Sequence, residues 1–382
     1  MRINNWSREA WPELEVRIGI DVHVLNGPPQ GTASVWLNVL PCLPPTHEYW
    51  LYSFDPRVTA RLLPGSQFVH RRIPVQQSHV RIQFVYPWLA RRDRCDAFHV
   101  NYYGPWFGAP GLVVTIHDLV YLDFPQYAPP GRRRQMALLG RLSARAAQLI
   151  TTDSGYWKTR IVDRFGVPAG RIAVVPPGLG LEWTRPDWKA IERAWARIGP
   201  RLPARFVLTV GRLDPRKNLA LAARVTRVLK EMNLADRLVV VGPEDFGGTE
   251  IRREWTRDGN DDLVTHLHGL STHELQAVYL HAKCLLFLSM AEGFGMPLLE
   301  AMALGTPVVA SNRTVMPEVC GDGALLVDPE NQDAVVSAAR TVLSDEAGRA
   351  GLVERGRSRV AMFTSDRMAG ELIGVYESAA AR

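Results

Sequence analysis

Residues 290–305 read MAEGFGMPLLEAMALG, and apolar runs that are typical of buried strands lie on both sides of this stretch. The run before it is CLLFLS at 284–289, and the run after it is VVAS at 308–311. A strand, a glycine-containing loop, a helix and a second strand in this order predict one βα unit of a parallel sheet. The stretch therefore favours an α/β fold.

Two carboxylates, Glu292 and Glu300, lie eight residues apart in this stretch. We expect Glu292 at the loop and Glu300 about two turns along the helix, near the same face. The loop glycines allow a close approach of the backbone to a ligand, and the start of a helix favours an anion such as a phosphate. Carboxylates accept hydrogen bonds from hydroxyls, so the stretch suits a sugar that carries a phosphate. On these residues alone, a solvated helix face and an ordinary turn remain the alternative.

The stretch resembles the donor-binding segment of retaining glycosyltransferases of family 4, which reads E-x-F-G-x-P-x-x-E and then A-x-A-x-G-x-P-V. The resemblance implies the GT-B fold, in which two doubly wound Rossmann-like domains face each other across a cleft and a C-terminal helix crosses back to the N-terminal domain. It also implies that this segment binds a nucleotide-sugar donor. The residues that fill the pattern are Glu292, Gly293, Phe294, Gly295, Met296, Pro297, Glu300, Ala301, Ala303, Gly305, Pro307 and Val308.

A second cationic motif follows the apolar strand RFVLTVG at 205–211 and precedes a helix expected at 219–232. Arg212 can meet a diphosphate through its planar guanidinium, and Lys217 can meet it as a point charge. The stretch is similar to the family pattern G-R-x-D-x-x-K-N, which implies that both residues neutralise the leaving nucleoside diphosphate. A solvated basic loop is the alternative interpretation.

The chain opens with a strand at 16–22, a turn at 26–31 and a helix at 32–40, as a doubly wound domain does. In the family this turn contacts the donor diphosphate or the acceptor. Gly31 is the one residue of the turn that matches the family pattern, so the resemblance implies this role for Gly31 alone. His117 follows the apolar run at 112–116, and strand ends are where α/β sheets place ligands. The family has His-Asp here, so the resemblance implies that His117 lines the reaction centre and contacts the transferred sugar.

The resemblance assigns the nucleotide base to His268, Gly269 and Leu270, which follow a strand expected within 263–270. Ser271 and Glu274 match a capping box at the start of the next helix. The neighbouring histidines have no Cys or Asp partner at ligand spacing, which disfavours zinc. No Asp-x-Asp follows a strand, so we expect no metal and no cofactor besides the nucleotide sugar.

We expect an acceptor-binding Rossmann-like domain at 1–183, a nucleotide-sugar-binding Rossmann-like domain at 184–362, and a C-terminal helix at 363–382. Strands are expected at 48–53, 67–70, 96–100 and 112–116, and a hinge at 181–187. Ser154 is expected to cap a helix. The length of 382 residues and the 46% hydrophobic content allow two cores.

Four scattered cysteines disfavour disulfides, and the start of the chain has no apolar leader. No apolar run approaches about 18 residues. We therefore expect a cytoplasmic protein, and the inner face of the cytoplasmic membrane is one place where it would act.

Positive charge is concentrated in the first half of the chain. Residues 1–190 hold 22 Lys and Arg against 14 Asp and Glu, a net charge of +8, and the remainder is −2. Anionic lipid headgroups, a polyprenyl diphosphate or a nucleic acid would fit this charge, and an arginine-rich genome would also explain it. We favour the first two partners over nucleic acid. The aromatic and basic stretch at 81–89 fits a core helix or part of an acceptor-facing or membrane-facing surface. The basic clusters at 91–94 and 132–134 fit membrane contact or solvated faces.

The resemblance implies a retaining hexosyltransferase, and with no Asp-x-Asp after a strand we expect it to be metal-independent. Family members with Phe294–Pro297 and the HDLVY segment at 117–121 often act in polysaccharide assembly, which favours mannose from GDP-mannose and a lipid-linked oligosaccharide or polysaccharide acceptor. Alternatives are rhamnosyl or glucosyl transfer from a dTDP or UDP sugar, or a non-catalytic nucleotide-binding protein. A phosphorylase or an epimerase would need a Schiff-base lysine or further acid and base residues, and we find neither.

Overall fold

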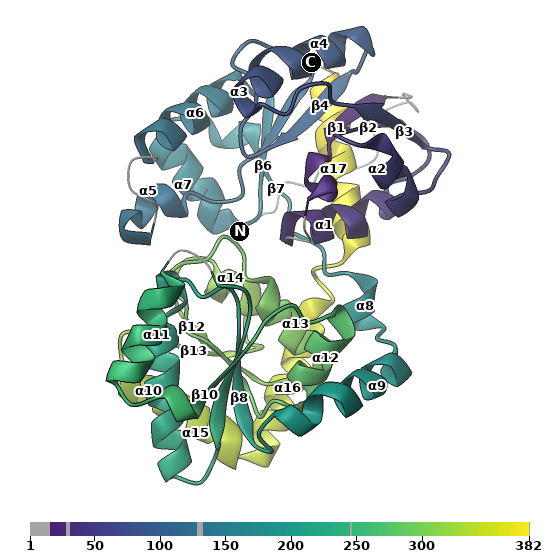
Figure 1. Ribbon diagram of the computed structural model, residues 1–382. Helices are drawn as coiled ribbons and strands as arrows, with labels where there is room; N and C mark the ends of the chain where they lie inside the picture. The colour runs from purple at the N-terminus through teal and green to yellow at the C-terminus, as the bar shows by residue number, and fades with distance from the viewer. Residues whose placement is uncertain (1–15, 28–30, 128–132, 245–246, 382) are drawn as a thin grey trace. The chain divides into compact units, whose positions relative to one another are not determined.

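The computed structural model describes residues 16–27, 31–127, 133–244 and 247–381, and the chain divides into two compact units (Figure 1). Unit 1 comprises residues 1–122, 130–180 and 364–382, and unit 2 comprises residues 123–129 and 181–363. Each unit contains one sheet in which all described strand pairs are parallel.

Unit 1 is built on a seven-stranded sheet with the order β3-β2-β1-β4-β5-β6-β7. The reversal of strand order beside β1 is the doubly wound arrangement, and it places a switch point between β1 and β4. The strands are β1 (Arg17–Asp21), β2 (Glu48–Ser53), β3 (Phe68–Arg72), β4 (Ala97–Asn101), β5 (Leu112–Thr115), β6 (Leu149–Thr152) and β7 (Ile172–Val174).

Helices cover both faces of this sheet. One buried cluster joins the sheet to α1 (Gly31–Val39) and α17 (Ser365–Ala380), and the other joins it to α4 (Tyr86–Arg92), α6 (Arg133–Ala146) and α7 (Gly155–Phe165). The remaining short elements are η2 (His23–Asn26), η3 (Leu40–Cys42), α2 (Pro56–Leu62), α3 (Ser78–Val80), the π-helix η4 (Arg81–Val85), α5 (Val120–Asp123) and η6 (Ala169–Arg171).

The C-terminal helix α17 is part of unit 1, and Figure 1 shows it in yellow among the elements of that unit. Its residues Leu372, Val375 and Tyr376 lie in the same core as the first strands. The Tyr376 hydroxyl is 2.7 Å from Nδ1 of the buried His99 on β4, and Nε2 of His99 is 2.6 Å from the Thr115 hydroxyl on β5. The end of the chain is therefore tied to the centre of the first sheet, as the fold prediction required.

Unit 2 is built on a six-stranded sheet with the order β10-β9-β8-β11-β12-β13. Its strands are β8 (Phe206–Val210), β9 (Arg237–Val241), β10 (Val264–Leu267), β11 (Leu285–Phe287), β12 (Val308–Ser311) and β13 (Leu325–Val327). The central strands β8 and β11 are buried along their whole length, as expected for parallel strands with helices on both faces.

The helices of unit 2 follow the strands in alternation. They are η5 (Pro125–Tyr127), α8 (Leu181–Thr184), α9 (Trp188–Ile198), η7 (Gly199–Arg201), η8 (Pro215–Lys217), α10 (Leu219–Glu231), α11 (Gly248–Arg257), η9 (Asp261–Leu263), α12 (Thr272–His281), α13 (Met296–Leu304), α14 (Met316–Cys320), α15 (Gln332–Ser344) and α16 (Glu346–Val360). One buried cluster joins one face of the sheet to α10, α11, α15 and α16.

The predicted α/β class with two doubly wound sheets is confirmed, and most strands begin within a residue or two of their predicted positions. The capping box of Ser271 and Glu274 and the cap at Ser154 are both present. The structure also differs from the prediction: α8 lies within the stretch expected as a hinge, and the helices α2, α6, α11 and α14 were not predicted. The predicted turn at 26–31 includes residues 28–30, and the basic cluster includes residue 132, which lie outside the described residues.

All four cysteines are free thiols, in agreement with the expectation of no disulfides. Within the described parts of the chain, none of the helices combines the length and the apolar character needed to cross a membrane.

Candidate functional site

A buried ion pair lies at the carboxyl ends of the two central strands of unit 2. Lys217 follows β8, Glu292 follows β11, and the distance between Lys217 Nζ and Glu292 Oε1 is 2.6 Å. The two residues are only 8% and 6% exposed. The ammonium also lies 4.9 Å from the centre of the Phe287 ring, within range for a cation–π contact. The sequence analysis assigned both residues to donor binding, but it did not predict that they contact each other.

The loop after β8 holds Lys217 in place through its own local structure. The Asp214 side chain accepts a hydrogen bond from the Arg216 backbone N–H, which starts the single turn of η8. Asn218 then takes a left-handed conformation with φ 54°, and its side chain donates to the Pro329 carbonyl. Gly211 has φ +149°, and a Cβ there would lie 2.9 Å from Lys217 Cε, so a side chain at 211 would displace the lysine.

Arg216 is a member of this site that the sequence analysis did not identify. Its guanidinium donates to the Ala291 carbonyl at 3.2 Å and lies 3.4 Å from Glu292 Oε2. The Met290 backbone N–H also donates to the Arg216 carbonyl, so the two loops are joined by main chain and side chain. Its position beside Lys217 is the sequence feature that could have identified it. Sequence alone does not tell which cation of this loop faces Glu292.

Glu292 stays ionised despite its burial. Burial alone would raise the pKa of this carboxyl, but the charges of Lys217 and Arg216 and the hydrogen bond from Lys217 outweigh it and hold the pKa below the ordinary value. The Glu292 backbone N–H donates to the Thr314 hydroxyl, which fixes the loop further. The arrangement is a fixed anionic group between two cations, and carboxylate oxygens have lone pairs to spare for a ligand hydroxyl.

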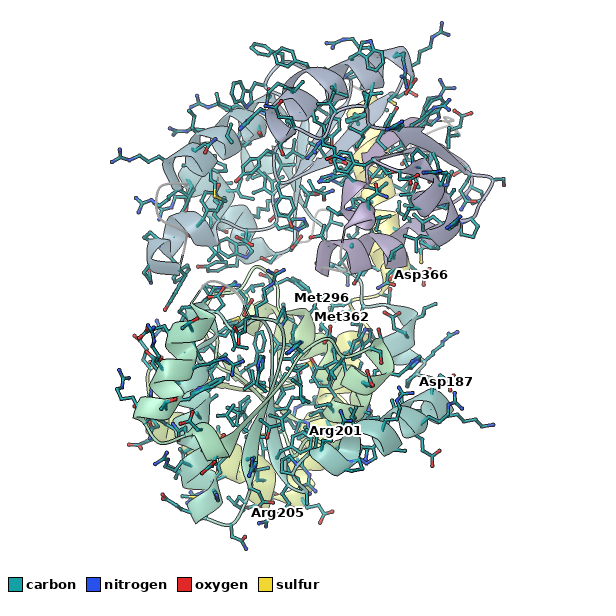
Figure 2. The ribbon with its side chains drawn as sticks, viewed as in Figure 1. Asp187, Arg201, Arg205, Met296, Met362 and Asp366 are labelled. Carbon is teal, nitrogen blue, oxygen red and sulfur yellow. The ribbon has the colours of Figure 1, made fainter. Side chains whose placement is uncertain are left out.

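The glycine loop leads directly into α13, whose first residue Met296 is labelled in Figure 2. Gly295 precedes the helix with φ +104°, a conformation that side chains rarely adopt. Pro297 is tolerated in the first turn because the N–H it lacks would have no partner within the helix. Phe294 is buried with its ring 5.7 Å from that of Phe363. The start of α13 therefore presents backbone N–H groups beside the glycine loop.

Glu300 lies in the second turn of α13, because the helix begins only at Met296. Glu300 is therefore nearer the start of the helix than the two turns that were expected. The buried Tyr279 hydroxyl, which the sequence analysis missed, donates to Glu300 Oε2 at 2.7 Å. Burial raises the pKa of Glu300 to about 7, against the hydrogen bond from Tyr279, which lowers it. Glu292 is thus an anion held by cations, whereas Glu300 changes charge near neutral pH.

The remaining residues predicted in unit 2 lie at ends of neighbouring strands. Arg212 is exposed and follows β8 after Gly211. His268 and Gly269 are exposed after β10, Gly269 has φ +69°, and Leu270 is partly exposed. Because carboxyl ends of parallel strands meet at one edge of a sheet, these residues share that edge with Lys217 and Glu292.

His117 occupies the corresponding edge of the sheet in unit 1. Its Nδ1 lies 3.0 Å from both oxygens of Asp153, which follows β6 as His117 follows β5. An ionised carboxylate only accepts, so Nδ1 carries the proton. Burial would lower the pKa of His117, but Asp153 and then Asp118 outweigh it and raise the pKa. Among the described residues the buried Nε2 has no hydrogen-bond partner.

Asp153 was missed, although the rule that selected His117 would also have selected it. Gly31 is the first residue of α1 and is exposed, and a Cβ there would meet no atom within 4 Å. Its neighbour Thr32 hydrogen-bonds Tyr102 at 2.9 Å, and the Tyr102 ring centre is 5.0 Å from that of His117.

His266, one of the histidines near this edge of the sheet, has other partners. His266 Nε2 is 2.7 Å from the Gly242 carbonyl and its Nδ1 is 2.8 Å from the Arg252 guanidinium. Over the described ranges, no three His, Cys, Asp or Glu side chains gather in a way that could hold a metal ion.

Comparison with known proteins gives the family. The Glycosyltransferase Family 4 description matches residues 17–183, and the Glycosyl transferases group 1 description matches residues 192–359. The O-antigen chain mannosyltransferase B of Escherichia coli is 28% identical over 288 residues, which cover 72% of this chain and 74% of the relative. A D-inositol 3-phosphate glycosyltransferase of Geodermatophilus obscurus is 32% identical over 388 residues, which cover 98% of this chain and 79% of the relative.

The chain spans 56% to 63% of the length of five other curated relatives. Among solved structures, that of Anabaena HepE in complex with UDP and glucose has a TM-score of 0.70 at 16% identity, and the match covers 95% of this chain and all of that chain. At this identity the likeness concerns the fold alone. With both halves matched and the two-sheet architecture in common, the chain belongs to glycosyltransferase family 4 and is a glycosyltransferase with the GT-B fold.

Proposed function

We propose that this glycosyltransferase is retaining and metal-independent, and that it moves mannose from GDP-mannose to a lipid-linked oligosaccharide or polysaccharide. The observation that carries the proposal is the buried Lys217–Glu292 pair, which lies where β8 and β11 end and beside the start of α13. The proposal includes contact between the basic first half of the chain and a membrane surface, where a lipid-linked acceptor would lie.

Positive charge would bind the donor diphosphate. Arg212 and Lys217 would neutralise the leaving nucleoside diphosphate, with the N–H groups of Gly293, Gly295 and the start of α13 as further donors. Fixed donors that face developing charge need no rearrangement during the reaction, so this electrostatic contribution is expected to be the largest one. The two cations are supplied by the chain, which is why we expect activity without a divalent metal.

The acids would bind the sugars at the two ends of the diphosphate. Glu300 would accept hydrogen bonds from the ribose, and Glu292, with Phe294, Met296 and Pro297 around it, from the transferred sugar. His268, Gly269 and Leu270 would contact the base, Gly31 the diphosphate or the acceptor, and His117 a sugar hydroxyl through Nε2.

Retention would follow from attack on the face that the diphosphate leaves. The bond between the anomeric carbon and the diphosphate oxygen breaks, and a bond from the acceptor oxygen to the same carbon forms. The acceptor proton passes to a donor phosphate oxygen and leaves with the nucleoside diphosphate. This route needs no nucleophilic side chain, and the sequence analysis found no obvious one.

The choice of mannose is supported by the E. coli relative, whose name is that of an O-antigen mannosyltransferase. The alternatives are rhamnosyl or glucosyl transfer from dTDP or UDP sugars. The inositol phosphate glycosyltransferases among the relatives add inositol phosphates to the acceptors worth assaying.

The test is a donor panel assayed for nucleoside diphosphate release, with and without EDTA. We expect release from GDP-mannose that EDTA does not reduce. Glu292→Gln should lower the rate at least tenfold, as loss of about 1.4 kcal/mol of transition-state stabilisation would. Glu346→Gln is the control, because that side chain is 91% exposed on α16. Release from another donor, or activity that EDTA abolishes, would contradict the corresponding part of the proposal.

A non-catalytic nucleotide-binding protein is the remaining alternative. It predicts nucleotide binding without release from any donor of the panel. The same assay therefore separates the two functions.

A further inference from the structure

One side of the segment from Ser78 to Arg92 carries large apolar side chains that the core does not use. The inner side already supplies buried residues, among them Tyr86, Leu89 and Ala90. On the outer side Phe84 is 69% exposed and Trp88 is 52% exposed. Their spacing of four residues along η4 and α4 places them on the same face.

A neighbouring loop extends this apolar surface. Phe107 is 71% exposed and Trp106 is 37% exposed, in the loop that follows β4. The Trp106 backbone N–H donates to the Gln83 side chain at 3.0 Å, and Arg91 donates to the Gly108 carbonyl at 2.6 Å. The loop is therefore held against the helical segment. We call Phe84, Trp88, Trp106 and Phe107 the aromatic surface.

The aromatic surface borders an open groove of about 600 Å³. Two arginines line it together with the apolar side chains. The lining residues are Gln83, Phe84, Pro87, Trp88, Arg91, Arg92 and Phe107. Contiguous exposed apolar groups are uncommon on the surfaces of soluble monomers, and where they occur they often mark interaction sites.

The charge around the aromatic surface is mainly positive. Residues 71–108 contain six arginines and two aspartates, a net charge of +4, with no Lys or Glu. Of the acids, Asp93 is only 8% exposed and is paired with Arg92. The Arg92 guanidinium also lies 4.6 Å from the centre of the Trp88 ring. Arg91, Arg92 and Arg94 are exposed. The surface thus combines aromatic rings with an excess of arginine.

We propose that this surface docks on an anionic phospholipid bilayer, with the aromatic rings at headgroup depth and Arg91, Arg92 and Arg94 against lipid phosphates. Tryptophan and arginine together suit the membrane–water interface, whereas a purely apolar groove would suit a protein helix. The inference deepens the proposed function and rests on it in one respect: a lipid-linked acceptor would be found at such a surface. Binding to lipid itself needs no transfer reaction.

The test is co-sedimentation of the full chain with vesicles of phosphatidylcholine, with or without phosphatidylglycerol. We expect binding only to the anionic vesicles, and weaker binding as salt is raised. Arg91→Ala/Arg92→Ala should reduce binding roughly 30-fold, from about 1 kcal/mol for each arginine. Arg91→Lys/Arg92→Lys keeps the charge and should retain binding. The triple change Phe84→Ala/Trp88→Ala/Phe107→Ala should reduce binding at equal arginine content.

Matched controls lie in unit 2. Trp188 is 60% exposed on α9, and Arg253 and Arg257 are about 70% exposed on α11. The variants Trp188→Ala and Arg253→Ala/Arg257→Ala should bind vesicles as the unaltered protein does. Circular dichroism spectra and unfolding midpoints identify any variant that fails to fold, and the arginine-to-lysine pair then decides the charge contribution.

Several results would overturn the inference. One is that the unaltered protein does not bind anionic vesicles, and another is that the triple variant binds them as well as the unaltered protein does. A third is that the triple change alters the molar mass measured by light scattering and leaves vesicle binding unchanged, which would identify a protein interface. Nucleoside diphosphate release without vesicles is measured in parallel. Release without vesicle binding rejects the docking surface and leaves glycosyl transfer standing, whereas vesicle binding without release from any donor does the opposite.

Discussion

At the scale of single residues, Lys217 and Glu292 have two roles, one in the stability of the fold and one in the proposed binding of the donor. The pair is buried, so each charge depends on the other, and it also lies where we propose that the donor binds. Removal of one partner from a buried pair leaves an uncompensated charge, which costs more than the pair contributes. Arg216, 3.4 Å from Glu292, reduces but does not abolish this dependence.

We predict that Lys217→Met and Glu292→Gln each lower the free energy of unfolding by about 3 kcal/mol, at the lower end for a broken buried pair because Arg216 remains. The double variant should lose less than the sum of the two, since neither charge is then left alone. Chemical denaturation of the three variants measures this. Strictly additive losses would show that the two side chains do not stabilise each other.

Glu300 gives the site a pH dependence. Its pKa of about 7 in the folded chain is above the ordinary value of 4.5, so the folded state holds the proton more tightly. This contribution to stability is present below pH 4.5 and is lost as pH rises through 7. A protonated Glu300 accepts hydrogen bonds from the ribose less well than a carboxylate does.

We therefore predict that nucleoside diphosphate affinity rises roughly tenfold from about pH 6 to about pH 8, as the ionised fraction of Glu300 grows. Glu300→Gln should remove this dependence. Tyr279→Phe should move the midpoint to higher pH, because the Tyr279 hydroxyl lowers the pKa of Glu300. Calorimetric titrations across this range are the measurement. A wild-type affinity that does not vary with pH would exclude an ionised Glu300 as a ligand.

The element that completes unit 1 comes from the far end of the chain. Helix α17 adds Leu372, Val375 and Tyr376 to a core formed with β1 and α1. Tyr376 also binds the buried His99, and burial lowers the pKa of that imidazole to about 3. Because the unfolded state holds the His99 proton more tightly, this group destabilises the fold as pH falls from 6.5 toward 3.

Tyr376→Phe should lower the free energy of unfolding by about 1–3 kcal/mol, because His99 Nδ1 is then buried without its partner. The control is Ile373→Val, a change at a partly buried position of the same helix that should cost about 1 kcal/mol or less. Urea denaturation compares the two. Equal, small effects of the two changes would mean that the hydrogen bond between His99 and Tyr376 adds no stability beyond that of packing.

Element prediction succeeded where hydrophobic periodicity was strong. The strand expected at 48–53 is β2 without any shift, and the capping box at Ser271 is present. Helix α11 was missed because its sequence is mostly polar and only residues such as Ile251 and Trp255 face the core. The contact between Arg216 and Glu292 could not be predicted, since it joins residues that lie 76 positions apart.

At the scale of the whole molecule, each unit has its own sheet and core, and the proposed nucleotide contacts lie mainly in unit 2. A ligand that binds the folded state stabilises it by about 2.7 kcal/mol when its concentration is about a hundred times the Kd. Nucleotide binding should stabilise the unit that makes the contacts more than the other unit.

Hydrogen exchange in GDP should therefore slow most at residues 211–218 and 292–300. The amides of β1 and α17 in unit 1 should exchange at their former rates. Exchange measured by mass spectrometry with and without GDP gives the comparison. Protection confined to unit 1 would refute the assignment of the donor to unit 2.

The most direct test of the central claim, that Arg212 and Lys217 bind the donor diphosphate, is the affinity for GDP compared with GMP by calorimetry. Arg212→Gln is the decisive variant because Arg212 is exposed, and Arg237→Gln is its control, since Arg237 is exposed at the opposite end of a neighbouring strand. We predict that Arg212→Gln weakens GDP binding roughly tenfold, as loss of a charge-assisted hydrogen bond would, and affects GMP less. Unchanged GDP affinity in Arg212→Gln, or an equal loss in Arg237→Gln, would contradict the account.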